Sequence, residues 1–282
     1  MTESPPLACP LDGLPLVQDG RQVRCSKNHS YDIARQGYIN LLPVQFKKSR
    51  DPGDSQSMVL ARTDFLDAGF YQPVADKLLA LLLDHSSSIN GRVTILDAGC
   101  GEGWYTCQLD HGLRQAGVNV QLIGLDISKP AIQAAARRSR QLVWLVATNS
   151  RPPVLASSLD VVFSIFGYPY LNTLLPLLKP GGILISVTPG PQHLIQLRQQ
   201  IYQQVDADDV GDEVADSESL LKSETLQFDI EQLAPEHVSN LLQMTPHFFK
   251  VRPALREQLA CQMLARCSID MRFSIYQRTG IS

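Results

Sequence analysis

The sequence predicts an α/β protein: a doubly wound, mostly parallel seven-stranded sheet preceded by a small N-terminal unit. Two observations carry this prediction. From residue 93 onward, apolar β-branched runs alternate with helical patterns, as in successive βαβ units. Before that point, cysteines and a histidine stand at the two ends of a short hairpin pattern. We therefore divide the 282 residues into an N-terminal unit, 1–45, and a main domain, 46–282.

Each element of the main domain has a local reason. Asp54 or Ser55 can cap a helix that ends at Gly69, and Ser128 caps another that runs through Arg138. Pro73 suits the first turn of the helix that follows it. Further helices are predicted near 104–109, 171–178, 188–204, 236–244 and 253–264. The seven strands are apolar runs at 93–97, 120–126, 142–146, 159–165 and 183–187, after 220, and at 271–276.

The centre of the sequence is a glycine turn between the first of these strands and a helix. The strand ends at Asp97, and glycines follow at alternate positions, at Gly99, Gly101 and Gly103. Because glycine has no Cβ, such a turn can adopt positive φ and let a ligand lie against bare backbone. The helix that begins at Trp104 offers free N–H groups behind it. The turn therefore predicts a ligand site.

A second acid specifies the kind of ligand. The next strand ends at Asp126, roughly 20 residues beyond the last glycine, where a second-strand acid meets ribose hydroxyls. Dinucleotide sites have the spacing G-x-G-x-x-G, whereas this chain has G-x-G-x-G. With the later turn 179–182, the pattern resembles Rossmann-like class I S-adenosylmethionine-dependent methyltransferases. That resemblance implies that Asp126 binds the ribose and that Ala147 and Thr148 lie near the adenine.

Composition and charge narrow the class of protein. No apolar run approaches the roughly 18–20 residues that span a membrane, and the N-terminus lacks a basic-then-apolar signal, so we expect a cytoplasmic protein. The net charge of −3 gives no global basic field. Residues 1–50 nevertheless hold seven Lys/Arg against four acids, whereas 206–218 hold seven acids and no Lys or Arg. The basic end fits contact with a polyanion or, equally well, a solvated surface.

The N-terminal unit has the spacing of a metal site. Cys9 and Asp12 precede a turn at Asp19-Gly20, and Cys25 and His29 follow it. A hairpin with ligands at its two ends is the geometry of a zinc ribbon, in which one thiolate is here replaced by a carboxylate. The alternative is a metal-free hairpin packed on the main domain.

Motifs along nearly the whole chain resemble one family. They include 9–29, 40–45, 48–54, 65–69, 71–73, 188–193 and 242–246. Together they resemble the bacterial large-subunit ribosomal RNA guanine-N1 methyltransferases, which join a zinc ribbon to a class I methyltransferase domain. Two positions depart from the family pattern: Asp12 stands where the family has Cys, and the segment 164–170 differs.

The resemblance implies functional residues, a substrate and partners. Tyr71, Gly101, Glu102 and His193 match the family's cofactor contacts. The full predicted cofactor set is Tyr71, Asp97, Gly99, Gly101, Glu102, Gly103, Asp126 and His193. The predicted zinc ligands are Cys9, Asp12, Cys25 and His29. The implied reaction is methyl transfer from S-adenosylmethionine to guanine N1 of large-subunit ribosomal RNA, with 1–45 as an RNA-recognition domain and a homodimer as a candidate assembly.

The sequence does not identify a catalytic residue. Guanine N1 must lose a proton and the base must be splayed out to reach the methyl group, which calls for a proton acceptor and an aromatic surface. Candidates are Asp32, Glu102 and His193 for the base, and Phe166, Tyr168 and Tyr170 for stacking. For Phe166, core packing is the alternative.

Other functions fit part of the same pattern. One is an RNA-binding or ribosome-assembly factor whose methyltransferase fold has degenerated. Another is a methyltransferase that acts on a different RNA or on a small molecule. A small-molecule substrate leaves the ribbon and the basic linker without a role. The intact glycines and both acids favour an active enzyme.

Overall fold

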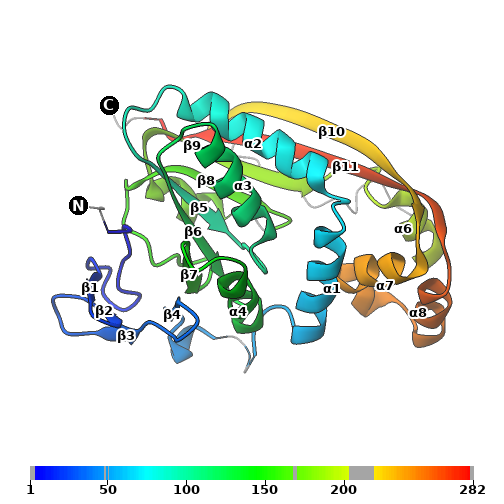
Figure 1. Ribbon diagram of the computed structural model, residues 1–282, viewed down its shortest axis with the longest axis horizontal. Helices are drawn as coiled ribbons and strands as arrows, with labels where there is room; N and C mark the ends of the chain where they lie inside the picture. Colours follow the sequence, from blue (N-terminus) through cyan, green and yellow to red (C-terminus); the bar gives the residue numbers. More distant parts are fainter. Residues whose placement is uncertain (1–3, 48, 50, 168–169, 203–218, 280–282) are drawn as a thin grey trace.

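The computed structural model describes residues 4–47, 49, 51–167, 170–202 and 219–279. Its body is an eight-stranded mixed sheet in the order β10-β11-β9-β8-β5-β6-β7-β4 (Figure 1). A second, three-stranded antiparallel sheet forms the N-terminal hairpin unit. The doubly wound, mostly parallel arrangement predicted from the sequence is confirmed, with one strand more than the seven expected.

The strands of the large sheet follow the predicted runs. Those of the parallel part are β5 (Val93–Ala98), β6 (Val120–Asp126), β7 (Val143–Val146), β8 (Leu159–Ile165) and β9 (Leu178–Pro189). The long strands β10 (Leu220–Leu233) and β11 (Leu264–Gln277) pair antiparallel with each other, and β11 pairs antiparallel with β9. Through this pairing, the segment between β10 and β11 lies near the carboxyl ends of the central parallel strands.

The extra strand comes from the N-terminal unit. β4 (Tyr38–Asn40) lies parallel to β7 and forms the sheet edge, with Tyr38 opposite Trp144. Three residues are too few to show a hydrophobic period, so the sequence did not signal this strand. Ahead of it, β1 (Val17–Asp19), β2 (Gln22–Arg24) and β3 (Ser30–Asp32) form the small sheet. The unit is thus joined to the main sheet through its own last strand.

Helix boundaries follow local capping chemistry. The Ser128 hydroxyl accepts the Ala131 N–H at 3.2 Å, so this predicted N-cap is confirmed. Of the two candidates at the first helix, Ser55 rather than Asp54 is the cap, because its hydroxyl accepts the Met58 N–H at 3.4 Å. The helices that cover the central strands are α1 (Gln56–Asp67), α2 (Gln72–Ser86), α3 (Trp104–Gln115), α4 (Lys129–Arg138) and α5 (Leu171–Leu174), the last continued by η2 (Leu175–Leu177). The others are η1 (Val44–Phe46), α6 (Ile195–Ile201), α7 (Pro235–Gln243), η4 (Pro246–Lys250) and α8 (Pro253–Ala260).

Helix α6 starts later than predicted. The sequence suggested a helix from residue 188, but 188–189 still belong to β9, and helical structure begins at Ile195. Between them, the backbone N–H of Gly190 donates to the Asp270 carbonyl at 2.7 Å, and the N–H of Gln192 donates to the Asp270 carboxylate at 2.9 Å. These bonds to a strand about 80 residues away hold the segment as a turn.

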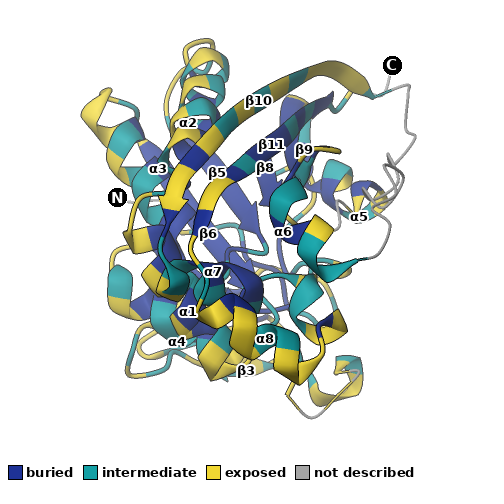
Figure 2. Ribbon diagram, turned by 90° about the vertical axis from the view of Figure 1, so that its right-hand side faces the viewer, coloured by how far each residue is buried: buried dark blue, intermediate teal, exposed yellow. Residues whose placement is uncertain are grey.

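Both faces of the sheet are covered. Along β5, Ile95 packs into a core shared with α2, α3 and α4, whereas Leu96 packs with α5 and the N-terminal unit. Figure 2 shows the central strands as buried and β10 as largely exposed. In the described part of the chain, no helix is both long and apolar enough to cross a membrane.

The third glycine of the turn is required for packing. Gly103 has φ +83°, and a Cβ there would lie 2.7 Å from Trp144 Cη2 and 2.8 Å from Ala135 Cβ. Trp144 also covers Gly124 on β6, where a Cβ would be 2.4 Å from its ring. The glycines therefore let Trp144 of β7 and Ala135 of α4 pack directly against the backbone of the turn and of β6.

We predict that Gly103→Ala destabilises the protein more than Gly117→Ala does. Gly117 has φ +81° with nothing within 4 Å of the added Cβ, so it isolates the backbone cost of roughly 1–2 kcal/mol. At Gly103, overpacking adds roughly 1–3 kcal/mol. Urea unfolding of the two variants measures the difference, and equal losses would contradict the packing argument.

Candidate functional site

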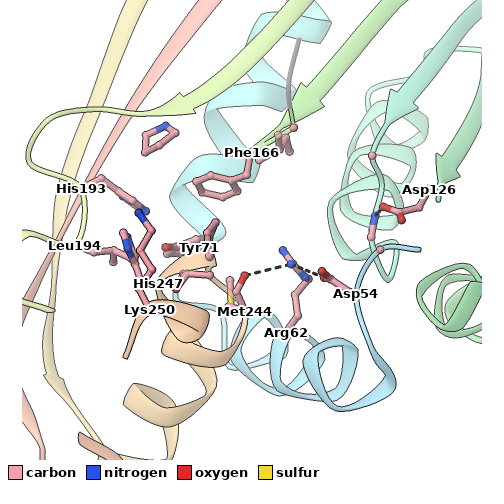
Figure 3. A pocket seen from close by; sticks show the side chains of 18 of the residues that line it. Asp54, Arg62, Tyr71, Asp126, Phe166, His193, Leu194, Met244, His247 and Lys250 are labelled. Atoms are coloured by element: carbon pink, nitrogen blue, oxygen red, sulfur yellow. Dashed lines mark hydrogen bonds and ion pairs between the residues drawn. The ribbon is translucent and has the colours of Figure 1, made fainter. Parts of the chain in front are cut away.

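A cavity of about 540 Å³ opens where β5, β6, β8 and β9 end. This is where open α/β sheets bind ligands, and the volume is that of a small-molecule site. One side, which we call the glycine side, is lined by Gly53, Asp54, Gly99, Gly101, Asp126 and Ile127. The opposite, C-terminal side is lined by Gly190, His193, Leu194, Arg198, Met244–His247 and Lys250 (Figure 3).

Asp126 is held rigidly on the glycine side. Its Oδ2 accepts the Gly101 N–H at 3.0 Å and its Oδ1 accepts the Ser128 N–H at 2.7 Å. Burial raises the pKa of this carboxyl, and the two backbone donors lower it. Both oxygens keep further acceptor capacity, which suits the two hydroxyls of a ribose. Ala147 N–H donates to the Asp126 carbonyl, so the predicted adenine loop begins beside it.

Three of the predicted cofactor residues support the glycine turn on the side that faces away from the cavity. Asp97 is 2% exposed and accepts the Thr106 hydroxyl at 2.6 Å. Glu102 is 1% exposed and forms an ion pair with Arg138. Neither these two acids nor Gly103 lines the cavity, whereas five predicted residues do: Tyr71, Gly99, Gly101, Asp126 and His193. The role of Asp97, Glu102 and Gly103 toward a cofactor is therefore indirect in this geometry and stays a prediction.

Three rings lie between the two sides. The Phe166 centroid is 6.1 Å from that of Tyr71 and 5.7 Å from that of His193 (Figure 3). Phe166 has φ +56° and is 37% exposed. A positive φ in an aromatic residue is strained, and such strain concentrates at functional sites. Phe166 thus lines the cavity, and its role in stacking stays a prediction. Tyr170 is 38% exposed, and Tyr168 lies outside the described residues.

His193 is a neutral donor. The Asp270 backbone N–H lies 3.4 Å from its Nδ1, which must accept this bond, so the inferred tautomer carries its proton on Nε2. Burial lowers the pKa of His193 to about 4, which keeps the ring neutral at pH 7. His193 therefore has no free lone pair with which to accept the guanine N1 proton. Of the other two candidate bases, Glu102 is paired with Arg138, and Asp32 lies in β3, outside the cavity lining.

Sequence reasoning missed several charged residues of the cavity. Arg62 pairs with Asp54 at 2.7 Å and donates to the Met244 carbonyl at 3.3 Å, which ties the glycine side to the C-terminal side. Asp54 and Met244 fall in the loop motifs 48–54 and 242–246, so a signal was present there. His247 and Lys250 stood in no recognised motif.

The N-terminal cluster has the geometry of a metal site. The ligand atoms of Cys9, Asp12, Cys25 and His29 all lie within 4.8 Å of one another. Four of the pairs lie at hydrogen-bond distance: His29 Nδ1 to Asp12 Oδ2 at 2.9 Å, to Cys9 Sγ at 3.5 Å and to Cys25 Sγ at 3.6 Å, and Cys25 Sγ to Asp12 Oδ2 at 3.5 Å. Tetrahedral zinc with bonds of about 2.0–2.3 Å places its ligands roughly 3.3–3.8 Å apart. The four side chains fit zinc.

Local structure brings these ligands together. Asn28 has φ +64°, a conformation that Asn tolerates, and lies in a turn in which its N–H donates to the Cys25 carbonyl at 2.9 Å. This turn folds His29 back onto Cys25. The Tyr31 hydroxyl lies 3.4 Å from Cys9 Sγ, as an outer partner that would orient a thiolate ligand.

Fold and site together define a class I S-adenosylmethionine-dependent methyltransferase that carries an N-terminal zinc ribbon. Family comparison agrees: residues 95–182 match the family described as a methyltransferase domain, and residues 7–50 match the zinc ribbon described as "RlmA, N-terminal".

Curated relatives define the family more closely. The chain is 35% identical to a putative 23S rRNA (guanine-N(1)-)-methyltransferase, YxjB, of Bacillus subtilis, over 69% of this chain and 68% of that protein. It is 33% identical to a putative enzyme of the same name from Micromonospora griseorubida, over 68% of each chain. It is 32% identical to the 23S rRNA (guanine(748)-N(1))-methyltransferase of Streptomyces fradiae, over 68% of this chain and 66% of that protein. The chain belongs to the family of 23S rRNA (guanine-N1)-methyltransferases.

We predict that Asp12→Ala loses zinc and Asp12→Cys holds it more tightly. Removing a ligand should weaken binding by at least the roughly 10–100-fold that loss of an outer partner costs. A thiolate should strengthen it, because zinc prefers sulfur to a carboxylate oxygen at such sites. Metal content and chelator competition of the purified proteins measure both. Asp19→Ala, on the same hairpin but outside the cluster, is the control, and equal zinc in Asp12→Ala would remove Asp12 as a ligand.

A pH-dependent contribution of Asp97 to stability is also predicted. Burial raises the pKa of Asp97 to about 8, above its unfolded value of about 3.9. Between these values the native state keeps a proton that the unfolded state has lost, so stability falls as pH rises, by at most about 1.4 kcal/mol per pH unit. The amide side chain introduced by Asp97→Asn has no titratable proton in this pH range, so the variant lacks this contribution.

The stability of Asp97→Asn relative to wild type should therefore improve from pH 5 to pH 8 and level off above it. Urea unfolding over this range measures the difference. Asp110→Asn, which removes a carboxylate that pairs with Arg114 on α3, is the control. Parallel curves for wild type and Asp97→Asn would show that Asp97 does not titrate in this window.

Proposed function

We propose that this chain transfers a methyl group from S-adenosylmethionine to N1 of a guanine in 23S ribosomal RNA. The observation that carries the proposal is one cavity with two unlike sides. The glycine side suits a nucleoside, and the opposite side offers aromatic and cationic groups suited to a nucleotide. The names of the relatives, and the zinc ribbon, support ribosomal RNA as the substrate.

The residues of the cavity have distinct roles in this proposal. Bound S-adenosylmethionine supplies an electrophilic methyl group on a sulfonium. Asp126 holds the ribose hydroxyls and so fixes where that methyl lies. Phe166 offers its face to the extruded guanine. The Nε2–H of His193 is a donor for the guanine O6, on which negative charge builds as N1 gives its proton to water.

Domain roles, location and assembly form part of the same proposal. Residues 1–45 serve RNA recognition and 46–282 methyl transfer, and the protein works in the cytoplasm, where ribosomal RNA is made. A homodimer is supported by β10, an edge strand of 14 residues on which Leu221 is 62% exposed.

The degenerate-fold alternative makes a different prediction. An assembly factor that has lost activity has no need of a rigid acid beside open glycine backbone. Here Gly99 and Gly101 keep φ of +97° and +55°, and Asp126 keeps both backbone donors. These features support a working cofactor site.

We expect the purified protein to form N1-methylguanine in an unmodified 23S rRNA transcript when S-adenosylmethionine is supplied. Mass analysis of nuclease digests identifies the base, and primer-extension stops locate it. Asp126→Ala should bind S-adenosylmethionine about 10–100-fold more weakly in calorimetry, since charge-assisted bonds of about 1.5–3 kcal/mol are lost. Asp110→Ala is the control. Wild-type protein without cofactor binding would refute the enzyme, and methylation of another base would refute the substrate.

A further inference from the structure

A basic and aromatic wall borders the C-terminal side of the cavity. Residues 245–256, here called the η4 wall, hold Lys250, Arg252 and Arg256 together with His247 and contain no Asp or Glu. The chain as a whole has a net charge of −3. Such a local excess of cations on an acidic protein is the electrostatic footprint of a polyanion site.

The η4 wall is anchored from behind. The Tyr202 hydroxyl and His247 Nδ1 are 2.8 Å apart, and Lys250 Nζ lies 5.7 Å from the centroid of the Tyr202 ring. The Arg256 guanidinium stacks 4.0 Å above the Phe248 ring, which fastens η4 to α8. These contacts hold the segment in place, so that its outward side chains have defined positions.

The outward-facing side chains of the η4 wall lie at the rim of the cavity, where it opens to solvent. Lys250 is exposed and lines the cavity, and in Figure 3 it lies beside His247 across from Asp54 and Asp126. The neighbouring Phe249 is 70% exposed. Within the described residues, no carboxylate pairs with Lys250 or Arg252. A cation without a carboxylate partner and an exposed aromatic ring therefore adjoin the mouth of the site.

We propose that the η4 wall binds the unpaired RNA that flanks the target guanine, with Lys250 on a backbone phosphate and Phe249 stacked on a neighbouring base. The inference rests on the proposed function. A guanine inside the cavity remains attached to its strand, so the next nucleotides must pass over the rim. Phosphate and a base face are what a cation beside an exposed aromatic recognises in single-stranded RNA.

This surface is separate from the zinc ribbon. Figure 1 places β1–β3 and α8 at opposite ends of the molecule, with α1 between them. The ribbon lies at the β4 edge of the sheet, whereas the η4 wall follows α7 on the side of β10 and β11. RNA held at both places would cross the cavity.

The test compares Phe249→Ala and Lys250→Ala with Phe249→Trp and Lys250→Arg. The probe is the shortest 23S rRNA fragment that the wild-type protein methylates. Each alanine variant should weaken RNA binding and raise the KM for RNA about tenfold, with kcat and the Kd for S-adenosylmethionine changed less than about twofold. The conservative variants should stay near wild type.

Salt dependence separates the two contacts. Lys250→Ala should reduce the slope of log K against log salt by about 0.7, the value for one phosphate on a single strand, while Phe249→Ala should leave the slope unchanged. Leu60→Ala and Arg140→Ala are matched controls: Leu60 is an exposed apolar residue on α1 outside the cavity lining, and Arg140 lies at the amino end of β7, away from the cavity. Neither should alter RNA binding.

Three results would overturn the proposal. Unchanged RNA affinity in both alanine variants would remove the η4 wall from the RNA surface while leaving the methyltransferase assignment intact. An equal loss of S-adenosylmethionine affinity would assign the wall to the cofactor instead. Wild-type protein that neither binds nor methylates 23S rRNA would remove the proposed function, and this inference with it.

Discussion

The two backbone bonds to the Asp126 carboxylate hold the site together. They join the glycine turn after β5 to the turn after β6, through the N–H groups of Gly101 and Ser128. The Ser128 hydroxyl extends the connection by donating to the Asp54 carbonyl at 2.7 Å. Three separate segments are thereby fixed around one acid. A ligand hydroxyl that binds this acid meets a surface that needs no rearrangement.

The other side of the cavity depends on contacts between distant parts of the chain. β11 pairs with β9, and this places the Asp270 N–H where it fixes the tautomer of His193. Arg62 reaches the Met244 carbonyl across 182 residues of sequence. The return of the chain through β10 and β11 thus completes a site that the parallel strands begin. The two sides are built by different means, one by local turns and the other by long-range pairing.

This difference explains how much the sequence could predict. The glycine spacing, Asp126 and the Ser128 cap are local signals within a few residues, and all were recognised. At the first helix the sequence left Asp54 and Ser55 as alternative caps. Asp12 was also recognised from spacing as one of the four candidate ligands, although its residue type departs from the family. His247, Lys250 and the pairing of Arg62 with Asp54 were missed, because nothing in the neighbouring residues shows what lies opposite in space. The short strand β4 was missed because three residues carry no period.

The edge position of β4 has a consequence for the ribbon. A metal-bound hairpin on a flexible linker would sample many orientations, but here the chain leaves the hairpin directly into the sheet. Cys9 and Cys25 are 2% and 3% exposed and belong to the same core as Leu96 and Leu125 of the central strands. The ribbon therefore stands at a fixed distance from the cavity. RNA that contacts both must already have the right shape, so shape can contribute to the choice of guanine before any base enters the site.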